Sequence, residues 1–158
     1  MFDFVEIEEY SGKAAHIYSV HLQDDELCLL DQFFEENGSH KAALENISNR
    51  LRVMGNETGC RREFFKHEEG APGDGVAALR EGNLRLYCLY FDNTAVFFGS
   101  GGYKPPGCRA YQDVAELNEK AEQMKAIAQI INQAIKDKKI RIEENGSLTI
   151  NDWNDEGD

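Results

Sequence analysis

The sequence predicts an α+β domain in which helices pack on an antiparallel β-meander. Residues 62–99 hold strand-like runs joined by connections too short for a parallel crossover. A helical hairpin precedes this block, and a long amphipathic helix and a terminal β-hairpin follow it. No internal repeat or low-complexity segment interrupts this order.

The first β-hairpin is predicted over residues 4–22, where apolar and polar residues alternate on both sides of the turn Ser11-Gly12-Lys13. Residues 24–37 predict a helix with Asp24 or Asp25 as its N-cap. A second helix is predicted over residues 39–55, with Ser39 as its N-cap. The short connection between the two helices predicts an antiparallel helical hairpin.

The meander is predicted from runs rich in aromatic and β-branched residues, separated by glycine-containing turns. We expect its strands within residues 61–69, 76–82, 84–91 and 94–100. A long helix over residues 112–137 follows, and its apolar face is typical of core packing. The last hairpin spans residues 139–150 around Asn145-Gly146.

A chain of 158 residues suits one domain with a single core, which we place at residues 1–150. We expect residues 151–158 to be a disordered acidic tail. No apolar run approaches the roughly 18–20 residues that span a bilayer. The acidic start "MFDFVEIEEY" is unlike a secretory signal, so we expect a cytoplasmic protein.

The net charge of −12 argues against general affinity for nucleic acid. The charge is uneven, however: residues 1–58 sum to −8, residues 59–110 to +1, and residues 111–158 to −5. Only the middle third could therefore assemble a basic surface. A neutral core between solvated acidic faces explains the same pattern.

The four cysteines do not indicate a metal centre. None belongs to a CxxC pair, whereas zinc ligands usually come in close pairs. Buried, inert thiols in a reducing cytoplasm account for them, and we expect neither metal nor cofactor. The cysteines are Cys28, Cys60, Cys88 and Cys108.

The glycine-rich run at residues 99–102 does not fit a phosphate-binding loop. Lys104 is followed by Pro105-Pro106, whereas a P-loop continues directly into a helix. A strand end at which glycines admit another backbone is the better interpretation.

Arg85 is the central candidate for a functional site, because an arginine inside a strand needs a partner or solvent. Either it pairs with an acid such as Glu81, or it lines a sheet face that binds phosphate. His67 is the best-placed acid or base among the histidines, although an ordinary exposed histidine explains it as well. Antiparallel pairing would bring the further candidates near Arg85: Arg80, Lys66, His67, Tyr103 and Lys104.

The block "ALREGNLRLYCLYFDNTAVFFGSGGYK" resembles the core of the RelE/ParE/HigB superfamily of toxins from bacterial toxin–antitoxin modules. The resemblance lies in a short strand ending in glycine, a strand of the form RLxY, and a strand followed by glycine and a basic residue. It implies a RelE-like domain with N- and C-terminal extensions. It also implies a metal-independent mRNA endoribonuclease that acts on the ribosome and is inhibited by a cognate antitoxin.

The resemblance also implies roles for individual residues. Arg85 would stabilise charge on the phosphoryl oxygens, with Arg80 as a weaker equivalent. Lys66 or His67 would help remove the 2′-proton, and Tyr103 or Lys104 would assist the leaving oxygen.

The chain departs from this family in its greater length and its acidity. A strongly acidic chain repels RNA unless the active face is locally positive. Two alternatives therefore stay open. One is a non-catalytic protein-binding module of the same fold, like the gyrase-binding ParE branch, and the other is an unrelated mobile-element protein.

Overall fold

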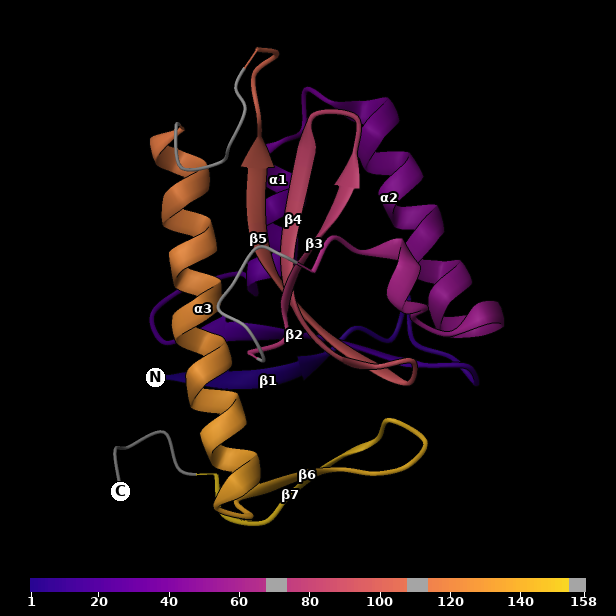
Figure 1. Cartoon of the computed structure of the whole chain (residues 1–158), viewed down its shortest axis with the longest axis vertical. Helices are drawn as coiled ribbons and strands as arrows, with labels where there is room; N and C mark the ends of the chain where they lie inside the picture. The colour runs from indigo at the N-terminus through magenta and orange to yellow at the C-terminus, as the bar shows by residue number, and fades with distance from the viewer. Residues whose placement is uncertain (68–73, 108–113, 154–158) are drawn as a thin grey trace.

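Five strands form one mixed sheet in the computed structural model, which describes residues 1–67, 74–107 and 114–153 (Figure 1). Neighbouring strands are antiparallel except β2 and β5, which run parallel. Across the sheet the order is β1 (Phe2–Glu6), β2 (His16–Leu22), β5 (Ala95–Tyr103), β4 (Leu84–Asp92) and β3 (Val76–Glu81).

The predicted meander is present as β3, β4 and β5, and the predicted first hairpin as β1 and β2. The prediction of a purely antiparallel sheet is wrong, because β2 pairs parallel with the first half of β5. The connection between these strands holds both helices and two further strands, so it is long enough for a parallel pair. The α+β class is confirmed, with a mixed rather than antiparallel sheet.

Helix α1 (Leu29–Glu36) starts later than its acidic residues predict. Asp24 has a left-handed backbone with φ of 74°, which removes it from a helical start. Cys28 occupies the N-cap position, but its side chain does not form a capping hydrogen bond. The Asp25 carboxylate instead accepts a hydrogen bond from Nε2 of Gln32 at 2.9 Å.

Helix α2 (Lys41–Val53) has His40 rather than Ser39 at its N-cap. A π-helical turn, Met54–Thr58, extends its end. Residues 61–67, expected to begin a strand, instead form a 3-10 turn at Arg62–Phe64 and a single antiparallel bridge to β3.

The sheet has a core on each face. The α1–α2 face buries Leu84, Leu86 and Cys88 of β4. The opposite face buries Tyr87 and Leu89 of the same strand under the long helix α3 (Ala115–Lys136). The alternation predicted for β4 is therefore present, and α3 runs across the sheet on the side away from α2 (Figure 1).

The C-terminal hairpin, β6 (Ile140–Ile142) and β7 (Leu148–Ile150), packs below the sheet, close to β1 and β2 (Figure 1). The Tyr18 hydroxyl donates to the carbonyl oxygen of Gly146 at 2.7 Å. Trp153 belongs to the predicted acidic tail, yet its indole N–H donates to the Phe2 carbonyl at 3.0 Å. Residues 154–158 lie outside the described part of the chain.

Candidate functional site

Arg80 and Arg85 face each other across the β3–β4 hairpin. The tight turn at Gly82-Asn83, where Gly82 has φ of 56°, sets a register that pairs these two arginines directly. The Cα atoms of such cross-strand pairs are roughly 4.5–5.5 Å apart. Both side chains therefore start from the same sheet face. Two cations that start from opposed positions on one face could also bind a single anion between them.

Glu81, which we considered as a partner for Arg85, forms its ion pair with a different cation. Glu81 pairs with Arg50 of α2 at 3.3 Å and accepts a hydrogen bond from Asn46 at 3.2 Å. The Arg85 guanidinium donates to the carbonyl oxygens of Gly82 and Leu84 at 2.8 and 2.9 Å. These bonds hold one side of the guanidinium against the turn at the end of the hairpin.

Lys66 shares the face of the two arginines. Its backbone N–H and carbonyl both bond to Ala78 at 2.9 Å, and the two residues form an antiparallel bridge. Residues paired in this way point to one face, and Ala78 is two positions before Arg80. The structure therefore places Lys66 on the same side as Arg80 and Arg85.

His67 lies on the other side of the sheet from Lys66. Its ring contacts Tyr90 at 5.0 Å between centroids and Phe65 at 6.1 Å, and both belong to the α1–α2 side. Its Nε2 donates to the Arg62 carbonyl at 2.8 Å. The structure therefore does not bring His67 together with Arg85.

Tyr103 also lies on the α1–α2 side, because it pairs with Leu84 of that core. Its ring stacks on His40, with 4.7 Å between centroids and an interplanar angle of 12°. Lys104 follows immediately, and its backbone N–H donates to the Asn83 carbonyl at 2.7 Å. This bond keeps Lys104 at the end of the hairpin that carries the arginines.

The glycines of β5 have a structural explanation. A Cβ atom on Gly101 would lie 1.8 Å from the Arg85 carbonyl oxygen, and one on Gly99 would lie 2.6 Å from the sulfur of Met124. The glycines therefore allow β4 and α3 to approach β5 closely, as expected. They do not end the strand, however, because β5 continues to Tyr103.

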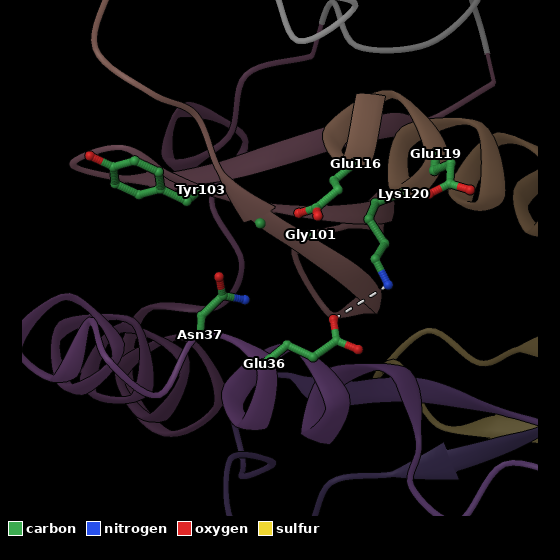
Figure 2. A pocket seen from close by; sticks show the side chains of 8 residues that line it. Glu36, Asn37, Gly101, Tyr103, Glu116, Glu119 and Lys120 are labelled. Atoms are coloured by element: carbon green, nitrogen blue, oxygen red, sulfur yellow. Dashed lines mark ion pairs between the residues drawn. The ribbon is translucent and has the colours of Figure 1, made fainter. Parts of the chain in front are cut away.

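A polar pocket of about 460 Å³ lies at the end of β5, between α1 and α3. In Figure 2, Glu36 and Lys120 reach across it from the two helices and form an ion pair at 3.4 Å. Glu116 and Glu119 extend from the start of α3, where acidic residues complement the helix dipole. That role accounts for Glu116, which lies in the first turn of α3, and we assign the pocket no ligand. Sequence reasoning missed the pocket because its residues come from segments about 80 positions apart.

The described cysteines are buried thiols. Burial raises the pKa of Cys60 to about 12 and holds the pKa of Cys88 well above its ordinary value. Such thiols are poor nucleophiles and poor metal ligands. Within residues 1–67, 74–107 and 114–153, no group of three or more His, Cys, Asp or Glu side chains could hold a metal ion. Cys108 lies outside these ranges.

No family model, curated protein or solved structure matches this chain. The described helices include none with the length and apolar character needed to cross a bilayer.

Proposed function

We propose that the chain is the toxin of a type II toxin–antitoxin module and acts as a metal-independent mRNA endoribonuclease associated with the ribosome. The proposal rests on the opposed Arg80–Arg85 pair, which Lys66 joins on the same face. An RNA phosphate between these side chains would accept charge-assisted hydrogen bonds from them.

The order of elements also supports the proposal. The toxins that the RLxY block resembles run through a strand, two helices and an antiparallel meander. The chain follows this order from β2 through α1 and α2 to β3, β4 and β5. Here β1, α3 and the β6–β7 hairpin are the N- and C-terminal extensions of the RelE-like domain.

The proposed reaction is transfer of the phosphoryl group to the neighbouring ribose hydroxyl. The 2′-oxygen attacks phosphorus, the bond from phosphorus to the 5′-oxygen breaks, and a cyclic 2′,3′-phosphate and a 5′-hydroxyl result. Arg85 and Arg80 stabilise the phosphoryl oxygens, and Lys66 helps remove the 2′-proton. Lys104 assists protonation of the leaving oxygen. His67 and Tyr103 have no role in this scheme, because they lie on the other face.

Replacing Arg85 tests the proposal. We expect Arg85→Gln to lower the cleavage rate of mRNA by about 10²–10³-fold, the usual cost of removing one transition-state donor. The assay follows a defined mRNA by primer extension, with and without translating ribosomes, and in the presence of EDTA. Arg141→Gln, an exposed arginine on β6, is the matched control and should cleave like the wild type. Intact mRNA after incubation with wild-type protein under every condition would contradict the proposal.

A non-catalytic protein-binding module is the second candidate. It is favoured by the separation of His67 and Tyr103 from Arg85, which leaves Lys66 and Lys104 as the acid–base groups among the described candidate residues. The same experiment discriminates between the two. A wild-type chain that stops growth on expression but leaves mRNA intact would support the binding module.

A further inference from the structure

Three polar side chains from distant segments lie in a hydrogen-bonded row where the C-terminal hairpin meets the sheet. The Ser147 hydroxyl lies 3.5 Å from Nε2 of His16, and Nδ1 of the same ring lies 2.6 Å from a carboxylate oxygen of Glu6. Glu6 ends β1, His16 begins β2, and Ser147 directly precedes β7. Ser147 and His16 are 131 positions apart, so no local motif in the sequence indicates the row.

The Glu6 carboxylate determines which nitrogen of His16 can act as a base. A carboxylate only accepts hydrogen bonds, so Nδ1 carries the proton and donates to Glu6. Nε2 then has a lone pair directed at the Ser147 hydroxyl. The separation of 3.5 Å is long for a hydrogen bond, as is common for a nucleophile and its base before substrate binds. Serine, imidazole and an orienting carboxylate are the three parts of a hydrolytic triad.

The packing of the hairpin on the sheet fixes Ser147 opposite His16. The Tyr18 hydroxyl donates to the Gly146 carbonyl at 2.7 Å, and the Tyr18 ring stacks on His16 with 6.1 Å between centroids. Gly146 lies so close to Thr94 that an added Cβ would be 2.0 Å from its carbonyl oxygen. The same oxygen accepts the His16 N–H at 2.8 Å. The serine and the imidazole are therefore held by one junction of backbone and side chains.

The row is accessible and separate from the arginine site. The His16 and Glu6 side chains are 24% and 37% exposed, and Ser147 is half-buried. His16 pairs with the first residue of β5, whereas Arg85 pairs with β5 close to its last residue. A small substrate can therefore reach Ser147 without occupying the proposed ribonuclease site.

Asn145 places a hydrogen-bond donor beside the serine. Its Oδ1 accepts the Ser147 N–H at 3.0 Å, which holds the carboxamide against Ser147. The Nδ2 group of this exposed carboxamide is a donor of the kind that stabilises an oxyanion in acyl transfer.

We propose that Ser147, His16 and Glu6 form a site that hydrolyses uncharged esters. The Ser147 oxygen attacks the carbonyl carbon as its proton passes to His16, and His16 then protonates the leaving alcohol as the ester C–O bond breaks. Water attacks the acyl-serine and gives a proton to His16, which returns it to Ser147 as the carboxylic acid leaves. Glu6 is a positioning residue, and Asn145 donates to the carbonyl oxygen.

The substrate class follows from charge. Glu6 lies in the site and the chain carries a net charge of −12, so an anionic acyl group would be repelled. The inference does not depend on the proposed ribonuclease activity.

Hydrolysis of p-nitrophenyl acetate by the full-length protein tests the proposal. We expect Ser147→Ala to lower the rate above the uncatalysed reaction at least tenfold. The turn survives this change because its bonds use the backbone N–H and carbonyl of Ser147. Ser39→Ala, which removes an exposed hydroxyl elsewhere, is the control and should hydrolyse the ester like the wild type.

Further variants test whether the residues act as a unit. His16→Gln should cause at least a tenfold loss, and combining it with Ser147→Ala should cost no more than either change alone. Glu6→Gln should lower kcat while KM stays unchanged, since Glu6 orients the base and does not touch the ester. Asn145→Asp keeps the oxygen that accepts the Ser147 N–H but removes the donor, and it should lower kcat at least tenfold.

A fluorophosphonate probe locates the nucleophile. The serine oxygen displaces fluoride from phosphorus, and peptide mass spectrometry should find the phosphonyl group on Ser147 of the wild type and not of His16→Gln. A wild-type protein that takes up no probe, or takes it up at another residue, would overturn the proposal. Equal hydrolysis by wild type and Ser147→Ala would do the same, and losses that multiply in the double variant would show that Ser147 and His16 act separately.

Discussion

At Gly101 of β5, the residue type is restricted by the backbone of the neighbouring strand β4. An added Cβ would meet the Arg85 carbonyl oxygen at 1.8 Å, and a backbone atom cannot move aside as a side chain can. We therefore expect Gly101→Ala to lower the free energy of unfolding by at least the 1–3 kcal/mol typical of overpacking. Urea denaturation followed by circular dichroism measures the loss.

Gly102→Ala is the matched control for this prediction. Its added Cβ would meet only the tip of the Leu117 side chain, at 3.3 Å. Since that methyl group can shift slightly, the cost should stay below about 1 kcal/mol. Equal losses for the two variants would show that the close approach of β4 is not what requires glycine at position 101.

At the scale of elements, Ser19 joins three parts of the fold. Its hydroxyl donates to the Phe98 carbonyl of β5 at 2.8 Å and accepts the Leu30 N–H of α1 at 3.1 Å. A residue of β2 thus caps the helix start for which Asp24 and Asp25 were the expected caps. The hydrogen bond from Ser19 to Phe98 also lies where the parallel β2–β5 pairing ends.

Removing this hydroxyl should weaken the fold measurably. Ser19→Ala leaves a buried N–H and a buried carbonyl without their partner, a cost of about 1–3 kcal/mol in unfolding free energy. Ser39→Ala is the informative control, because Ser39 is exposed and does not cap α2, so it should change stability by less than about 0.5 kcal/mol. A larger loss for Ser39→Ala than for Ser19→Ala would contradict this account of the two helix starts.

Elements encoded by local signals were predictable from the sequence. The alternation in residues 84–91, the turn at Asn145-Gly146 and the periodicity of α3 all correspond to observed structure. The parallel pairing of β2 with β5 was not predictable, since alternation specifies which face a residue takes but not which strand lies beside it. The starts of α1 and α2 were misplaced because nearby Asp and Ser residues resembled caps that the fold does not use.

The candidate site was also only partly predictable from the sequence. The opposition of Arg80 and Arg85 follows from a short hairpin turn, and strand alternation alone separates Lys66 from His67. The remaining contacts of the site depend on long-range packing. The pairing of Glu81 with Arg50 and the stacking of Tyr103 on His40 join segments that no local pattern relates.

In the whole molecule, the division of the core between the two sheet faces does not match the distribution of charge along the chain. The two cores lie on opposite faces of the sheet, whereas residues 59–110 form the only third of the chain whose charges sum to a positive value. The proposed ribonuclease site draws on this third through Lys66, Arg80 and Arg85, which share one face of the sheet.

The buried thiol of Cys60 makes the stability of the whole fold sensitive to alkaline pH. Burial raises its pKa from 9.0 to about 12, so between these values the unfolded chain has released a proton that the native chain still holds. The unfolding free energy should therefore be unaffected by this group below pH 9 and should fall as pH rises toward 12, by up to about 1.4 kcal/mol per pH unit. Cys60→Ala removes the titrating group, and its stability curve from urea denaturation under reducing conditions should be shallower over that range. Parallel curves for the two proteins would mean that the native thiol ionises as readily as the unfolded one.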